Sequence, residues 1–312
     1  MFSGSISKSV FGISLTVCLS WATVAEESAF DKQLSLEVVQ TLAADDMGGR
    51  AAGTEGNAKA RAYLLNKVTE AGYQPVGQSF EHQFTFTPRL PEGAEDITGT
   101  NILFKIPGNG STGKTIVISA HYDHVGTRGG QIFNGADDNA SGVAGVLAIA
   151  EALTTTPPQN DVIFALFDAE EMGLQGARAF VRNRQEIDPN IIFNINFDML
   201  SRSDKNELYV AGVFHRPELK PVVEGIASQA PVKLLMGHDD PELGNNDWTL
   251  SSDHGPFHLD GVPFLYFGVE DHPHYHRPTD DYESIPVEFF LRSLETVVLA
   301  AREVDAHLAS QN

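Results

Sequence analysis

Short runs of apolar residues alternate along most of the chain with longer stretches in which apolar residues recur every three or four positions. The short runs predict buried β-strands, and they are residues 101–106, 115–120, 161–167, 191–197, 208–211 and 262–267. The longer stretches predict helices, and they are residues 139–153, 174–184, 217–227 and 286–308. Strands and helices that alternate in this way predict an α/β protein with three layers, α/β/α, around a mixed and mostly parallel central sheet.

The segment ahead of this alternation has a different pattern. Apolar residues at helical spacing predict two helices, over residues 34–44 and 58–71. Phenylalanines separated by polar residues over 80–86 predict a half-buried strand, and a polar loop follows over 87–100. Because no repeat or linker-like stretch interrupts the rest of the chain, we expect residues 26–312 to form a single compact domain.

The first 25 residues have the pattern of a secretory signal peptide. Lys8 is their only charged side chain, residues 10–21 are mostly apolar, and the small residues at 23–25 suit a cleavage site. The apolar stretch is shorter than the roughly 20 residues that a membrane-spanning helix needs. A lipoprotein signal with Cys18 as the acylated residue is the alternative, which the bulky Val17 disfavours. We therefore expect a bacterial protein that is periplasmic or secreted and has no membrane attachment once the signal is removed.

Charge and cysteine content narrow the classes of partner. The chain has 21 basic and 42 acidic residues, which gives a formal net charge of −21. Binding to nucleic acid or to an anionic membrane needs a basic surface, so both are disfavoured as partners. Cys18 is the single cysteine, which excludes an internal disulfide framework and any metal site built on paired cysteines.

Polar side chains gather where the predicted strands end. They are His121, Asp123 and His124 after residues 115–120, Asp137 and Asp138 before the helix at 139–153, Asp168, Glu170 and Glu171 after residues 161–167, and Asp198 after residues 191–197. In open α/β sheets, ligand sites lie beyond the carboxyl ends of the strands. We therefore expect these separate segments to contribute to one site.

The chemistry of this group predicts a metal centre. Carboxylates held a few ångströms apart repel one another, and a bound divalent cation removes that repulsion. Imidazole and carboxylate ligands without sulfur suit Zn²⁺ and, less strongly, Mn²⁺ or Co²⁺. Five of the eleven histidines lie between residues 254 and 276, and we expect one of them to complete the centre, although the pattern does not identify which.

Two pairs of nearby residues suggest roles within the centre. Residues two apart on an extended chain point the same way, so Asp123 is placed to accept the second ring N–H of His121 and to orient that imidazole. Glu170 and Glu171 are adjacent, so they point in different directions. We expect one of them to bind metal and the other to act as a general base toward the metal-bound water.

An ordered set of motifs covers most of the chain between residues 40 and 300. The motifs are Gly49-Arg50 through Gly53-Thr54, His121-Tyr122-Asp123-His124, Gly135-Ala136-Asp137-Asp138-Asn139-Ala140-Ser141-Gly142, Glu170-Glu171, Asn196-Phe197-Asp198, Ser252-Asp253-His254 and His276-Arg277-Pro278-Thr279-Asp280. Each motif alone is weak, but the ordered set is specific. Together they resemble the M28 family of zinc peptidases, whose aminopeptidases use two metal ions. The resemblance implies an M28-type peptidase domain over residues 26–312.

The resemblance also implies a role for each residue of the centre. Asp137 would bridge two zinc ions, His121 and Asp198 would complete one site, and Glu171 and His276 would complete the other. Glu170 would be the general base, Asp123 would support His121, and a cis peptide would join Asp137 to Asp138. The implied activity is hydrolysis of N-terminal residues from peptides by a hydroxide that bridges the metals.

Other functions remain open at this stage. A glutaminyl cyclase has the same fold with one zinc ion and performs acyl transfer, and a non-catalytic binding module would have lost ligands or the base. A two-metal phosphoesterase would need basic groups around its phosphate. For a peptidase we expect peptide substrates with a free N-terminus and a neutral or hydrophobic first residue. The segment 237–250, with Trp248 and Leu250, is the candidate pocket wall, and Arg277 keeps carboxypeptidase activity open.

Overall fold

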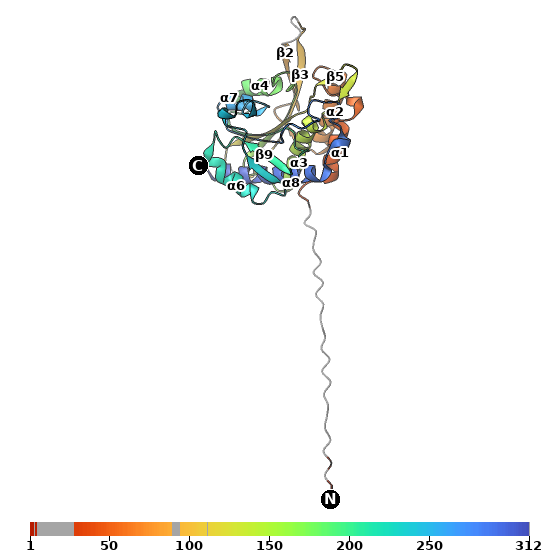
Figure 1. Cartoon of the computed structure of the whole chain (residues 1–312). Coiled ribbons are helices and arrows are strands. Elements are labelled where there is room, and N and C mark those ends of the chain that lie inside the picture. The colour runs from red at the N-terminus through yellow and green to blue at the C-terminus, as the bar shows by residue number, and fades with distance from the viewer. Residues whose placement is uncertain (3, 5–27, 89–93, 111, 312) are drawn as a thin grey trace.

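The computed structural model describes residues 1, 2, 4, 28–88, 94–110 and 112–311. Within them, nine strands form one sheet in the order β1-β3-β7-β4-β8-β11-β9-β10, with β2 beside β3 (Figure 1). The strands are β1 Gln74–Pro75, β2 Glu81–Phe86, β3 Ile97–Ile106, β4 Thr115–His121, β7 Asp161–Phe167, β8 Ile191–Phe197, β9 Glu207–Ala211, β10 Lys233–Met236 and β11 Phe264–Gly268. A separate two-stranded ribbon consists of β5 Gly126–Arg128 and β6 Gln131–Phe133.

The four strands at the centre of the sheet are parallel. β4 pairs in parallel with β7 and with β8, and β8 pairs in parallel with β11. β3 is antiparallel to β7, while β11 is antiparallel to β9 and β9 is parallel to β10. The carboxyl ends of β7, β4, β8 and β11 therefore meet at one edge of the sheet, where a ligand site is expected.

Helices cover both faces of the sheet. They are α1 Lys32–Leu42, α2 Glu55–Glu70, α3 Gly142–Thr155, α4 Gln175–Arg182, α5 Arg184–Ile187, α6 Lys220–Ala227, α7 His254–Leu259 and α8 Val287–Ser310. Side chains alternate between the faces along each strand. On β4, Ile116 and Ile118 pack in the larger core with α1, α2, α3, α6 and α8, whereas Val117 packs in the smaller core with α4 and α7. The predicted α/β/α layers and mixed sheet are confirmed.

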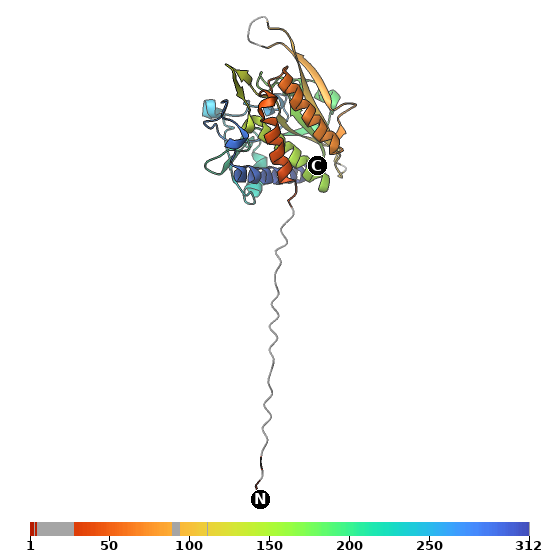
Figure 2. The same ribbon diagram turned by 90° about the vertical axis from the view of Figure 1, so that its right-hand side faces the viewer.

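β2 and the first half of β3 form an arm that rises above the body of the molecule (Figures 1 and 2). Residues 97–102 of β3 pair with β2, and residues 102–106 pair with β7. β3 thus begins inside the segment expected to be a loop. Its first residues, Ile97 to Gly99, do not form the apolar run that marked the rest of the strand.

Three further differences have local causes. α3 begins only at Gly142, because residues 136–141 form a wider π-helical turn whose Asp138 and Asn139 are non-helical. β10 is four residues long and α7 contains glycine and proline, so neither gave a clear periodic pattern.

The predicted signal peptide over residues 1–25 lies outside the described residues, except for residues 1, 2 and 4.

No helix in the described part of the chain is both long enough and apolar enough to cross a membrane.

Candidate metal centre

The edge where the parallel strands end gathers acidic side chains and imidazoles from five segments. His121 ends β4, Glu170 and Glu171 follow β7, and Asp198 follows β8. Asp138 lies in the turn before α3, and His276 lies in the segment after β11. All of these residues except Glu170, together with His124 after β4, form two clusters of potential metal ligands, which we call site A and site B.

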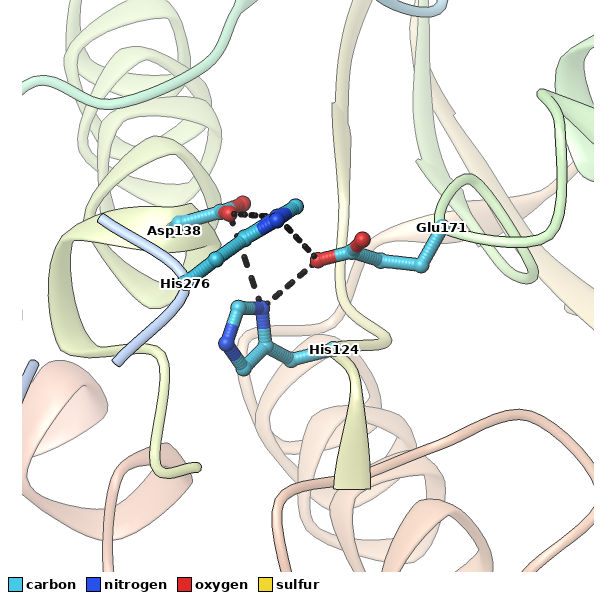
Figure 3. Close-up of side chains that lie close together, drawn as sticks. All are labelled: His124, Asp138, Glu171 and His276. Carbon is cyan, nitrogen blue, oxygen red and sulfur yellow. Dashed lines mark ion pairs between the residues drawn. The ribbon is translucent and has the colours of Figure 1, made fainter. Parts of the chain in front are cut away.

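Site A consists of His124, Asp138, Glu171 and His276 (Figure 3). One ligand atom from each residue lies within 4.8 Å of all the others. His276 Nε2 is 3.0 Å from Asp138 Oδ2 and 3.3 Å from Glu171 Oε1. His124 Nδ1 is 2.8 Å from Glu171 Oε1 and 3.6 Å from Asp138 Oδ2. All four side chains therefore present a donor atom to the same small volume.

Site B consists of His121, Asp138 and Asp198. His121 Nε2 is 3.4 Å from Asp138 Oδ1 and 3.3 Å from Asp198 Oδ1. Asp138 belongs to both sites and presents Oδ2 to site A and Oδ1 to site B. A carboxylate in this position can bridge two cations.

Asp137, which the resemblance placed as the bridging ligand, lies in neither cluster. Its Oδ1 accepts hydrogen bonds of 2.7 Å from both the main-chain N–H and the hydroxyl of Ser201. Its Oδ2 is 2.8 Å from Nε2 of His272. The geometry thus gives Asp138 the place expected for Asp137. The cis peptide joins Asp138 to Asn139, one position later than expected.

A hydroxyl of the same motif also contacts Asp137. Ser141 lies four residues after Asp137, and its hydroxyl donates to the main-chain oxygen of Asp137 at 2.7 Å and to its Oδ1 at 3.1 Å. Residue spacing could not have singled out Asp137 in advance, because Asp138 and Asn139, which lie between Asp137 and Ser141, have non-helical φ and ψ. His124 carried no signal either and was not expected as a ligand.

Two buried carboxylates hold the loops that carry the ligands. Asp123 accepts hydrogen bonds from the main-chain N–H groups of Glu170 and Glu171, at 3.0 and 3.3 Å. Asp280 accepts from the N–H of Asp138 at 3.1 Å and from that of the preceding residue. His121 Nδ1 contacts the main-chain oxygen of Asp123 at 3.1 Å, while the carboxylate expected to orient the ring is 3.6 Å away.

Arg50 joins the site to the N-terminal segment. Its side chain is fully buried and donates to the carbonyl oxygens of Tyr122, Leu42 and Gly135, at 2.9, 2.6 and 2.9 Å, and also to that of Asn134. Burial lowers its pKa to about 10, which leaves the guanidinium charged at neutral pH. It therefore places a fixed positive charge behind the acidic cluster.

The close packing of buried carboxylates and imidazoles shifts the pKa values of the site residues. Burial raises the pKa of Glu170 well above its usual range, and neighbouring Asp198 and Glu171 raise it further, while His121 opposes them. Burial acts to lower the pKa of His276, but the carboxylates of Asp138 and Glu171 raise it to about 10. These opposing shifts are expected where carboxylates and imidazoles lie a few ångströms apart in a buried site.

A cleft opens beside sites A and B, and its lining is mostly polar. Polar and charged lining residues are Asp138, Glu170, Glu171, Asp198, Asn245, Ser251, Asp271 and His276, and the apolar and aromatic ones are Met199, Trp248, Tyr266, Val269 and Tyr275. Trp248 is therefore part of the cleft, as expected from the sequence. Leu250 is 52% exposed and is not part of the lining.

Comparison with known proteins gives likenesses in sequence and in fold. The profile of peptidase family M28 matches residues 101–301. Aminopeptidase YwaD of Bacillus subtilis (strain 168) is 29% identical over 236 residues, which are 73% of this chain and 49% of that protein. The chain spans about half the length of the curated relatives that it matches first.

Solved structures share the fold. A zinc aminopeptidase from Bacillus subtilis aligns with a TM-score of 0.72 and 18% identity, over 89% of this chain and 96% of that one. The glutaminyl cyclase of Porphyromonas gingivalis aligns with a TM-score of 0.70 and 18% identity, over 90% and 99%. Both therefore share the overall fold of this chain.

We expect Arg50→Met to lower the free energy of unfolding by about 3–5 kcal/mol, because it leaves buried carbonyl groups without a donor. Urea unfolding of the metal-free protein measures the change. Arg182→Met is the matched control, since Arg182 is exposed on α4 and a surface change is worth at most about 0.5 kcal/mol. Equal unfolding midpoints for the two variants would show that the hydrogen bonds of the buried guanidinium do not stabilise the fold.

Proposed function

Because the chain belongs to peptidase family M28, we propose that it is an aminopeptidase that uses two zinc ions. The observation that supports this most directly is the pair of ligand clusters that share Asp138. Site A would be held by Asp138, Glu171 and His276, and site B by Asp138, His121 and Asp198. The proposal replaces Asp137 with Asp138 and keeps the other four ligands expected from the sequence.

The residues present suit zinc. They offer imidazole nitrogen and carboxylate oxygen, which Zn²⁺ prefers, with Mn²⁺ and Co²⁺ as substitutes. The three carboxylates of Asp138, Glu171 and Asp198 would balance three of the four positive charges of two zinc ions. Buried Glu171 Oε1 has no hydrogen-bond partner among the described residues, as expected of an atom that binds a cation.

When bound, zinc ions supply Lewis acidity that polarises a carbonyl group and makes a water molecule more acidic. Glu170 lines the cleft together with ligands of both sites and is not itself a ligand of either site. Its carboxylate is therefore available to act as the general base. Its carboxylate would accept the proton of the attacking water and return it to the leaving amine. Asp123 would act through the main chain, because it holds the N–H groups of Glu170 and Glu171.

The cleft favours a substrate with a free, positively charged N-terminus and an apolar first side chain. Acidic groups in the lining of the cleft would attract the substrate's amine, and Trp248, Tyr266 and Tyr275 would contact the side chain of its first residue. Glutaminyl cyclases among the structures of the same fold make intramolecular acyl transfer the second candidate function. We also propose that residues 1–25 direct export to the periplasm or the medium.

We expect the purified protein to bind two zinc ions per chain and to hydrolyse aminoacyl p-nitroanilides with apolar aminoacyl groups. Metal analysis and release of p-nitroaniline, before and after chelation, measure both properties. Chelation should abolish hydrolysis and added Zn²⁺ should restore it. One zinc ion, no hydrolysis and cyclisation of an N-terminal glutamine peptide would identify a cyclase instead.

Asp138→Asn and Asp137→Asn separate the two adjacent aspartates. We expect Asp138→Asn to lose both zinc ions, because each site depends on one of its oxygens. Asp137→Asn should keep two ions and lose stability, because Asp137 accepts hydrogen bonds from Ser201. Metal analysis after gel filtration gives the stoichiometry of each variant. The reverse result would return the bridging role to Asp137.

Glu170→Gln tests the general base. We expect it to retain both metals, because Glu170 belongs to neither cluster, and to lose at least about 100-fold in kcat, which is the low end of what general-base catalysis supplies. Metal analysis and initial rates on the same sample measure the two effects. A variant with comparable kcat would show that another group takes the proton.

A further inference from the structure

His124 lies in site A, although it is not one of the metal ligands expected from the sequence. Its side chain is 1% exposed, and its Nδ1 points into the same volume as Nε2 of His276 (Figure 3). Nδ1 lies 2.8 Å from Glu171 Oε1, yet it has no hydrogen-bond partner among the described residues, and neither has Nε2. The contact is therefore close without having the direction of a hydrogen bond.

Other histidines near the site have a partner for at least one ring nitrogen, although His254 Nδ1 has none among the described residues. His254 Nε2 lies 2.8 Å from the main-chain oxygen of Trp248, and His272 Nε2 lies 2.8 Å from Oδ2 of Asp137. In structural roles, buried polar groups are almost always hydrogen-bonded. Both ring nitrogens of His124 depart from this rule, and the ring lies in a cluster where another imidazole and two carboxylates present donor atoms to the same small volume. This arrangement indicates a shared ligand.

The space for this ring is provided by the backbone. Gly135 has φ +58°, and a β-carbon on it would lie 2.5 Å from His124 Cγ and 2.2 Å from the main-chain oxygen of Asp138. Only glycine allows the imidazole and the turn that carries Asp138 to approach so closely. The position of His124 is thus determined by the same turn that positions Asp138.

We propose that His124 Nδ1 is a fourth protein ligand of site A, so that the two metal ions are bound unequally. This inference rests on the proposed function. Site A would have four protein ligands, and site B would have three. Four protein ligands are typical of zinc held for structure, and three with an open position are typical of catalytic zinc. The ion at site A would bind more tightly, and the ion at site B would be the one that exchanges.

Two substitutions test this in the full chain. His124→Asn places an amide, a poor zinc ligand, where Nδ1 lies. His124→Cys places a thiolate, which binds zinc and cobalt, on the same side of the site and about one bond length short of the Nδ1 position. The matched control is His258→Asn on α7, because His258 belongs to neither cluster. Circular dichroism of each metal-free variant shows that it has folded, and the cysteine variant keeps the test open if the asparagine variant does not fold.

Titration of the metal-free proteins with Co²⁺, followed by visible absorption, and metal analysis give the affinity of each step. We expect the parent and His258→Asn to bind in a tight and a weaker step. His124→Asn should weaken the tight step by more than the roughly 10–100-fold that loss of a supporting group costs. His124→Cys should add a sulfur-to-cobalt charge-transfer band in the near ultraviolet, and the parent, whose single cysteine is Cys18, should lack it.

Two results would overturn the inference and leave the proposed function intact. One is a His124→Asn variant that binds both Co²⁺ ions with the same affinities as the parent, while the parent binds two ions and hydrolyses aminoacyl p-nitroanilides. The other is a His124→Cys variant that binds Co²⁺ without the charge-transfer band. A parent that binds no metal would overturn the proposed function together with this inference.

Discussion

The buried guanidinium of Arg50 is the interaction on which the site depends. A single side chain donates hydrogen bonds to main-chain oxygens on both sides of the site, in the turn after β4 and in the segment before α3. A positive charge without water is costly, and these donors are satisfied only if all of the segments lie in place. The result is a rigid arrangement in which His124 and Asp138 can face one another. The positive charge of Arg50 also reduces the electrostatic repulsion among the carboxylates of the site.

The architecture and most of the candidate ligands could be predicted from the sequence. Buried strands have continuous apolar runs, and residues such as His121 and Asp198 sit at their carboxyl ends, so their convergence follows from the parallel order of the strands. The prediction was less accurate beyond the end of each strand. Asp123 lies past the last residue of β4, where side chains no longer alternate. Its carboxylate accepts hydrogen bonds from the main chain of Glu170 and Glu171, which was not predicted, and also lies 3.6 Å from His121 Nδ1.

Adjacent acidic residues were the second difficulty. Asp137 and Asp138 are identical in type, and only the backbone of the turn decides which one faces the cleft. Asp138 has non-helical φ and ψ, so ordinary helical geometry cannot assign its direction. His124 was missed for a related reason. Its contact with site A depends on the space beside Gly135, which is a property of the folded backbone and has no counterpart in residue spacing.

The order of the site residues along the chain has a consequence for when the protein can act. His121 and His276 lie far apart in sequence, and Asp280, which holds the turn of Asp138, lies later still. Contacts between such distant residues form late in folding, because long loops must close first. A partly synthesised or unfolded chain therefore has no assembled site in which to hold metal. The proposed metal centre would therefore be complete only after the segment that carries His276 and Asp280 has been synthesised and has packed against the sheet edge.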